Sequence, residues 1–152
     1  MYKEIDGDLL VLFKSNKFDI IAHGCNCQCT MGSGLALQIK EQFPEVWEKD
    51  KQTIKGDLNK LGTYNFTELT NNNKIYNLYT QFGYGTTRPH ISYPAVELCI
   101  QKLFYLERTR RIGLPKIGCG LAGGDWKVVS EIIQYYENKY RVDNITIVNY
   151  KI

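Results

Sequence analysis

The stretch IGCGLAGGDW, residues Ile117 to Trp126, is the part of the sequence from which the rest is best interpreted. It follows an apolar run, residues 112–117, that is typical of a strand, and it precedes a segment with helical spacing. Its four glycines leave backbone N–H groups uncovered by side chains, beside the positive end of a helix dipole. This arrangement favours a phosphate or pyrophosphate ligand, although a tight strand-to-helix turn also tolerates glycine.

The glycine spacing argues against two common nucleotide sites. It is neither G-x-G-x-x-G with a downstream acid nor G-x-x-x-x-G-K-[ST]. A dinucleotide dehydrogenase and a P-loop NTPase are therefore both disfavoured.

Two further loops follow predicted strands. Residues 23–34 come after the apolar run 18–22 and precede a helical pattern that runs from Leu35 to Phe43. Residues 81–89 follow the predicted strand 74–80 and contain too many breakers for regular structure. Because ligands of α/β sheets bind outside the carboxyl ends of the strands, we expect all three loops to border one crevice that binds a phosphate group.

The remaining elements alternate in the same way. Further strands are predicted at 2–5, 61–66 and 145–150, and residues 9–13 fit either a helix turn or a strand. Helices are predicted to begin near Pro44, Pro94 and Trp126. The alternation predicts an α/β sheet with helices on both faces, and the length of 152 residues predicts one domain, 1–152.

Composition narrows the class of protein. The formal net charge of +3 is mild. The nearest approach to a basic cluster is Arg108, Arg110 and Arg111. These residues lie at a predicted helix end, where cations interact favourably with the helix dipole. The sequence therefore gives no strong indication of nucleic-acid binding. The N-terminus has no signal-peptide pattern, no run is apolar enough to span a membrane, and the five cysteines are an odd number. We expect a cytoplasmic monomer with reduced thiols and no membrane contact.

Three motifs together resemble a macrodomain, the module that binds ADP-ribose. They are Gly7-Asp8-Leu9 after the first strand, Asn26 followed by the loop Gly32 to Ala36, and the loop Ile117 to Gly124. The resemblance covers essentially the whole chain and implies a three-layer α/β/α fold with a central mixed sheet. The residues that it assigns to substrate binding are Gly7, Asp8, Leu9, Gly24, Cys25, Asn26, Met31, Gly32, Ser33, Gly34, Leu35, Ala36, Gln81, Gly118, Cys119, Gly120, Leu121, Ala122, Gly123, Gly124 and Tyr150.

Within the family, residues 115–121 and the final strand resemble the subgroup of terminal ADP-ribose glycohydrolases and yeast-type ADP-ribose 1''-phosphate phosphatases. Gln81 stands where those glycohydrolases carry a lysine, and Ala122 stands where the human glycohydrolase has an aspartate. The phosphatase-like features are kept, since His23 lies just before Cys25-Asn26 and Asp125 ends the second glycine-rich loop. The resemblance therefore favours dephosphorylation of ADP-ribose 1''-phosphate, without a cofactor.

The residues allow that chemistry but also plainer roles. His23 could act as acid or base, or simply be satisfied by hydrogen bonds at a strand end. Asp125 could orient water or the imidazole, or only cap the helix that follows it. Removal of ADP-ribose from protein or nucleic acid, and non-catalytic reading of ADP-ribose, remain alternative functions, with ADP-ribosylated macromolecules as partners.

The cysteines could in principle act as metal ligands or as nucleophiles. Cys25, Cys27 and Cys29 alternate with His23, which could suggest zinc, but the chain lacks the paired C-x₂₋₄-C spacing of zinc sites. A thiol phosphatase needs an arginine a few residues after its cysteine, and neither Cys25 nor Cys119 has one. We therefore predict no metal site and no thiol nucleophile.

Overall fold

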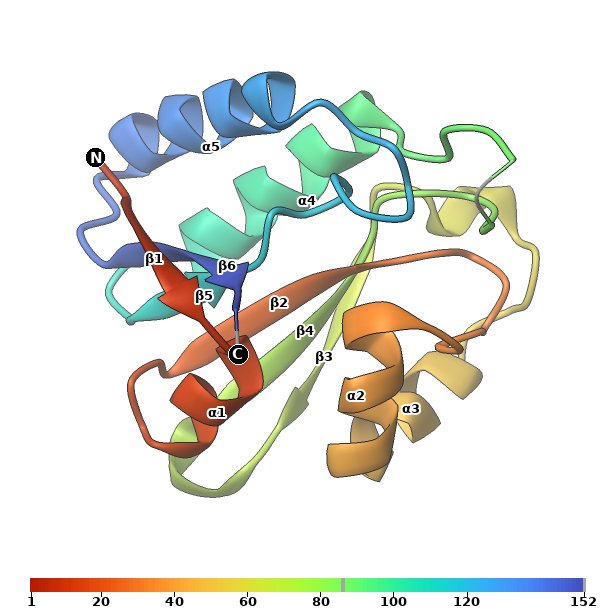
Figure 1. Cartoon of the computed structure of the whole chain (residues 1–152), viewed down its shortest axis with the longest axis horizontal. Coiled ribbons are helices and arrows are strands. Elements are labelled where there is room, and N and C mark those ends of the chain that lie inside the picture. The colour runs from red at the N-terminus through yellow and green to blue at the C-terminus, as the bar shows by residue number, and fades with distance from the viewer. Residues whose placement is uncertain (86, 152) are drawn as a thin grey trace.

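A mixed sheet forms the middle layer of the molecule (Figure 1). The computed structural model describes residues 1–85 and 87–151. Within them, six strands pair in the order β1-β6-β5-β2-β4-β3. The strands are β1 (Lys3–Gly7), β2 (Ile20–Cys25), β3 (Tyr64–Glu68), β4 (Lys74–Tyr79), β5 (Ile112–Leu114) and β6 (Ile145–Tyr150). All neighbours are parallel except β3, which runs antiparallel to β4 at one edge.

Helices cover both faces of this sheet (Figure 1). On one face lie α1 (Leu9–Lys14), α2 (Gly34–Gln42) and α3 (Pro44–Lys51), and on the other lie α4 (Tyr93–Leu106) and α5 (Trp126–Tyr140). Two 3-10 turns, η1 (Leu58–Lys60) and η2 (Thr70–Asn72), flank β3. The predicted three-layer α/β/α architecture is confirmed.

Alternation along the strands divides the core in two. Successive side chains of a strand point to opposite faces, so Ile20 and Ala22 pack with α4 and α5, whereas Ile21 packs with α1, α2 and α3. On the α4 and α5 side, a buried stripe on α5 includes Val129 and Ile133. Helices therefore pack on both faces of the sheet and hold its strands in place.

On the α1–α3 face, polar residues interrupt the apolar pattern near the carboxyl ends of β2 and β4. Along β2, Ile21 is followed on the same face by His23, and along β4, Ile75 is followed by Asn77. His23 and Asn77 are paired in register and are both buried. Polar side chains therefore occupy the interior near the carboxyl edge of the sheet.

Several predicted boundaries were wrong, for identifiable reasons. The strand predicted at 112–117 ends at Leu114, because Pro115 has no N–H for the ladder and the chain turns where the Cys119 amide bonds the Lys116 carbonyl. The strand predicted at 18–22 runs from Ile20 to Cys25, because the backbone of 23–25 pairs with β4. The strand predicted at 61–66 begins at Tyr64, after the turns that follow η1. Residues 9–13 form helix α1.

Candidate functional site

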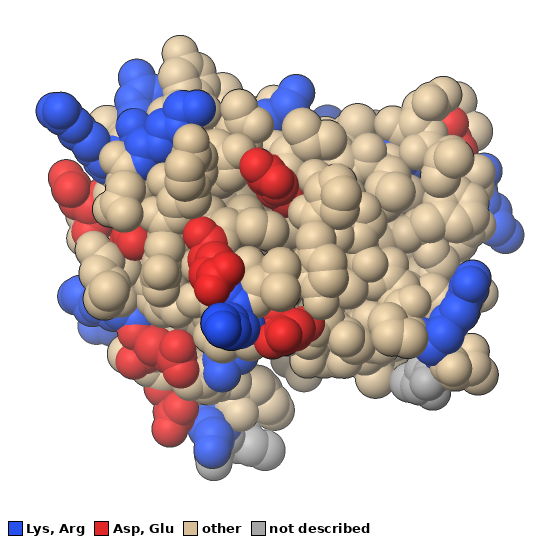
Figure 2. Space-filling view, turned by 90° about the horizontal axis from the view of Figure 1, so that it is seen from above, with Lys and Arg blue, Asp and Glu red and all other residues tan. Residues whose placement is uncertain are grey.

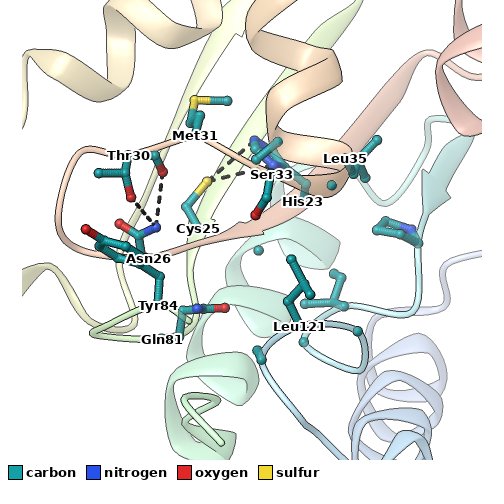
Figure 3. Close-up of a pocket in the computed structure, with 18 of the residues that line it drawn as sticks. His23, Cys25, Asn26, Thr30, Met31, Ser33, Leu35, Gln81, Tyr84 and Leu121 are labelled. Carbon is teal, nitrogen blue, oxygen red and sulfur yellow. Dashed lines mark hydrogen bonds between the residues drawn. The ribbon is translucent and has the colours of Figure 1, made fainter. Parts of the chain in front are cut away.

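A cavity of about 670 Å³ opens at the carboxyl edge of the sheet (Figure 3). Its walls come from the loops that follow β2, β4 and β5, as predicted. The predicted site residues that line it are His23, Gly24, Cys25, Asn26, Met31, Gly32, Ser33, Gly34, Leu35, Ala36, Gln81, Gly118, Gly120, Leu121 and Ala122. A volume of this size lies within the range of pockets that hold small molecules and cofactors.

The lining is nearly free of charge. Among the residues that the structure describes, it contains one cation, Lys116, and no carboxylate. The Lys116 ammonium lies 3.9 Å from the Glu4 carboxylate, and its side chain is partly exposed. No acidic lining group would therefore repel an anionic ligand, and Lys116 would attract one.

The glycines of the two loops fall into two kinds. A Cβ at Gly124 would lie 2.5 Å from the Gly118 carbonyl oxygen, and Gly118 itself has a φ of +72°, so these two glycines are required by the loop's own shape. A Cβ at Gly32 or Gly120 would meet no atom within 4 Å, and neither backbone is left-handed. Both residues line the cavity, so their missing side chains leave its space open.

The start of α2 also faces the cavity. Gly34, Leu35 and Ala36 begin this helix and line the space. Ser33, the N-cap residue, makes no side-chain capping bond. The first N–H groups of α2 are therefore not satisfied by their cap, which suits an anion at the helix start.

His23 is a buried member of the lining. Its Nε2 lies 2.6 Å from Asn77 Oδ1, and Cys25 Sγ lies 3.4 Å from the same nitrogen. Burial lowers the pKa of His23 to about 4, and the Asn77 hydrogen bond opposes this only in part. The imidazole is thus neutral near pH 7. Burial raises the pKa of the Cys25 thiol well above its usual value, so it is not an activated nucleophile.

Asn26 uses its amide within its own loop. Nδ2 donates to the Thr30 hydroxyl at 2.8 Å and to the Thr30 carbonyl at 3.1 Å, and Oδ1 accepts from the Gln28 amide at 2.8 Å. The side chain therefore shapes the rim of the cavity, next to Tyr84 and Gln81 (Figure 3).

Gln81 is similarly engaged. Its Nε2 donates to the Gly83 carbonyl at 2.8 Å, which holds the loop after β4, and its backbone forms an isolated bridge with Ile91. Its side chain has no basic group. This residue supports the wall of the cavity.

Asp125 does not lie with His23 in the lining. Its carboxylate accepts a hydrogen bond from the Lys127 amide at 3.0 Å and so caps α5. Capping accounts for an aspartate at this position. His23 lines the cavity and Asp125 does not, so capping is the role of Asp125 that the geometry supports, and its part in catalysis stays a prediction.

Seven other predicted binding residues also lie outside the lining. Leu9 is the first residue of α1 and packs in the core, and the Asp8 carboxylate caps α1 by accepting from the Leu10 and Val11 amides. These contacts give both residues structural roles. Gly7 and Tyr150 are register partners at the ends of β1 and β6. The others are Cys119, Gly123 and Gly124, which belong to the loop after β5.

Sequence reasoning missed some of the lining. Thr30, Gly85, Pro115, Lys116 and Ile117 border the cavity but were not among the predicted site residues. Lys116 had a readable signal, since a lysine directly before a glycine-rich loop is well placed to meet a phosphate. Thr30 had none, because its role depends on the fold of the loop around Asn26.

The described part of the chain shows no group of three or more His, Cys, Asp or Glu side chains that could hold a metal ion. None of its helices is both long and apolar enough to traverse a bilayer.

The basic cluster has internal partners. Arg111 Nη2 lies 2.8 Å from Asp19 Oδ1, and Arg110 Nε lies 3.7 Å from Asp19 Oδ2. The Arg111 hydrogen bond and charge hold the pKa of Asp19 down at about 2.

On the face seen in Figure 2, charges of both signs gather toward the left, and much of the centre and right is uncharged.

The fold and the cavity define a class: a three-layer α/β/α protein with a weakly charged cavity between glycine-rich loops at the carboxyl edge of its sheet. Residues 22–133 match the model of the Macro domain family. The chain therefore belongs to the macrodomain family, and the resemblance seen in the sequence is confirmed.

Individual relatives extend over nearly the full length. The chain is 39% identical over 148 residues to an uncharacterized 17.5 kDa protein of enterobacteria phage T4, covering 92% of each. It is 25% identical over 155 residues to the ADP-ribose 1''-phosphate phosphatase of Candida albicans, covering 91% of this chain and 95% of that protein. The structure of Thermosipho africanus DarTG in complex with ADP-ribose superposes with a TM-score of 0.74 at 17% identity, covering all of this chain (100%) and 42% of that one.

Proposed function

We propose that this protein binds ADP-ribose in the cavity and removes the terminal phosphate from ADP-ribose 1''-phosphate. The observation that carries the proposal is the pair of open glycines, Gly32 and Gly120. No contact with the residues that the structure describes requires glycine at these positions, yet both border the same space. Bare backbone there lets a diphosphate approach N–H groups of two loops at once.

Two relatives support the choice of ligand and reaction. The Thermosipho africanus protein of the same fold was solved with ADP-ribose, and the Candida albicans relative is an ADP-ribose 1''-phosphate phosphatase. The absence of a carboxylate from the described lining also suits a substrate that carries several negative charges.

His23 is the general base and then the general acid of this reaction. A neutral imidazole can take a proton from water as the water oxygen attacks phosphorus and the bond from phosphorus to the sugar oxygen breaks. The imidazolium then returns the proton to the sugar oxygen. An imidazole with a pKa near 4 is a weak base but a strong acid toward the leaving oxygen. N–H groups around the phosphate would stabilise the charge that develops on its oxygens.

The test is calorimetric titration with ADP-ribose, followed by phosphate release from ADP-ribose 1''-phosphate. We expect binding and turnover in the natural protein. His23→Ala should lower kcat by at least about 100-fold with little change in affinity, since a positioned acid–base group contributes on that scale. Absence of phosphate release by the natural protein would refute the reaction, and absence of binding would refute the ligand.

A second candidate is a non-catalytic reader of ADP-ribose. The observation in its favour is that the described lining offers no carboxylate beside His23, so the acid–base equipment is sparse. ADP-ribose binding with neither phosphate release nor loss of ADP-ribose from a modified protein would select this function. Loss of ADP-ribose from the modified protein would instead indicate the glycohydrolase activity.

A further inference from the structure

A chain of hydrogen bonds leads from His23 away from the cavity; four of its members are buried, and the fifth, Asn65, is half-buried. His23 Nε2 lies 2.6 Å from Asn77 Oδ1, and Asn77 Nδ2 donates to Asn65 Oδ1 at 2.9 Å. Asn65 Nδ2 lies 3.2 Å from the Tyr79 hydroxyl, which donates to Asp50 Oδ1 at 2.7 Å. The chain thus crosses β2, β4 and β3 and ends on α3.

The interior surroundings make each bond of this chain matter. His23, Asn77, Tyr79 and Asp50 are all at most 2% exposed. A buried polar atom left without a partner is costly, because it loses its bonds to water. The four groups are therefore expected to adopt one consistent pattern of donors and acceptors.

The carboxylate sets the direction of that pattern. An ionised carboxylate only accepts, so Tyr79 must donate to Asp50 and accept from Asn65. Asn65 then presents its oxygen to Asn77, and Asn77 presents its oxygen to His23. Reversing both amides would leave the Tyr79 hydroxyl donating to Asn65 and Asp50 Oδ1 without a donor.

Two neighbouring groups support this direction. Burial raises the pKa of Asp50, while the Tyr79 hydrogen bond and the Lys60 ammonium oppose that rise and favour the ionised form. The Cys25 thiol lies 3.6 Å from Asn77 Oδ1 and can donate to this oxygen. The oxygen of Asn77 therefore faces His23.

We propose that Asp50 is a positioning residue that, through Tyr79, Asn65 and Asn77, holds His23 as the tautomer protonated at Nε2. Nδ1 is then the unprotonated nitrogen of the imidazole, and the Cys25 thiol lies 3.9 Å from it. This inference rests on the proposed function for its catalytic consequence: Nδ1 is the atom that takes the proton from the attacking water and returns it to the sugar oxygen. Asp50 is 1% exposed and lies outside the cavity lining, and three side chains separate it from His23, so it acts on the imidazole only through them.

Histidine nitrogen spectra of the full chain test the tautomer directly. The chain has two histidines, so a His90→Gln variant assigns the His23 signals. We expect Nε2 protonated and Nδ1 unprotonated in the natural protein. In Asp50→Asn, whose amide can present either a donor or an acceptor, and in Tyr79→Phe, which cuts the chain, we expect the tautomer ratio to move about tenfold toward Nδ1–H.

Kinetics supply the second readout. Both variants should lower kcat for phosphate release by about tenfold, because more of the imidazole then carries its proton on Nδ1, which can no longer accept one from water. The Kd for ADP-ribose should stay within about twofold, because the loops are intact. Glu48→Gln, an exposed acid on the same helix, is the matched control and should change neither the spectra nor kcat.

The possible results separate the claims. Nδ1–H in the natural protein, or an unchanged tautomer in both variants, overturns the positioning role even if kcat falls. A shifted tautomer with unchanged kcat overturns the catalytic consequence. A natural protein that releases no phosphate refutes the proposed reaction, while the spectra still decide whether Asp50 sets the tautomer.

Discussion

At the scale of single residues, glycines that look alike in the sequence have different causes. Gly118 is needed because its backbone is left-handed, and Gly124 is needed because a side chain there would collide with the Gly118 carbonyl oxygen. Gly32 and Gly120 border open space in which the protein has no atom. Only the second kind predicts a ligand, because no internal contact explains the absence of a side chain.

Gly120→Val therefore tests the ligand site with little risk to the fold. The valine side chain would occupy the space in which a diphosphate is expected to approach the backbone. We expect the affinity for ADP-ribose to fall by at least about 100-fold, or about 3 kcal/mol, while unfolding stability changes by less than about 1 kcal/mol. Calorimetry and urea unfolding measure the two effects.

Lys127→Val provides the matched control, since this residue is exposed and lies outside the cavity lining. It should bind ADP-ribose like the natural protein. If Gly120→Val kept its affinity for ADP-ribose, the proposal that the diphosphate binds at this loop would be wrong.

His23 predicts how stability depends on pH. Its folded pKa of about 4 lies below the ordinary value of 6.5, so between these values the unfolded chain binds the proton and the folded chain does not. Stability contributed by the neutral imidazole is present above about pH 6.5 and is lost as the pH falls toward 4, with a total of about 3 kcal/mol.

Urea unfolding of the natural protein and of His23→Gln at pH 7 and pH 4.5 isolates this contribution from other groups. Burial raises the pKa of Asp50, so this carboxyl acts in the opposite direction, but it does so in both proteins. The natural protein should lose more stability than His23→Gln on acidification. Equal losses would mean that His23 titrates normally in the folded state.

At the scale of elements, the sequence predicted what is local. The glycine-rich loops, the helix starts and the strand at 145–150 depend on spacing within a few residues, and all three were found as expected. The extension of β2 through His23 to Cys25 depends on pairing with β4, some fifty residues along the chain, and was therefore missed. The role of Asp50 could not be predicted, because an acid in a short helix resembles any surface acid until Tyr79 is placed against it.

Variants of Asp125 distinguish a helix-capping role from a catalytic role. Asp125→Ala removes the hydrogen bond to the Lys127 amide at the start of α5, which should cost about 1 kcal/mol of unfolding stability. Asp125 lies outside the cavity lining, so kcat for phosphate release should stay within about twofold. Asp125→Asn, which can still cap, should restore most of the stability.

A loss of turnover in both Asp125 variants, with stability kept in the asparagine form, would return this residue to the reaction. That result would require the loop after β5 to move on binding, since the carboxylate is engaged at the helix end.

At the scale of the whole molecule, sheet order explains why the loops meet. β5, β2 and β4 are neighbours in the sheet and all three are parallel, so their carboxyl ends lie side by side. The loops that line the cavity follow these three strands, whereas Gly7 and Tyr150 belong to β1 and β6 on one flank. The sequence implies a shared edge for the loops, but the order of strands along that edge is settled only by long-range pairing.

A ligand held by three loops of one sheet should stabilise the entire fold. If ADP-ribose binds the folded chain alone, a concentration of 100 times Kd adds about 2.7 kcal/mol, which for a domain of this size raises Tm by about 5–10 °C. Thermal unfolding with and without ADP-ribose measures this shift, which needs no turnover and so applies equally to an enzyme and to a reader. The shift should vanish in Gly120→Val and persist in Asp50→Asn, because the first variant fills the cavity and the second alters only the chain behind His23. A similar shift in Gly120→Val would place the ligand elsewhere on the molecule.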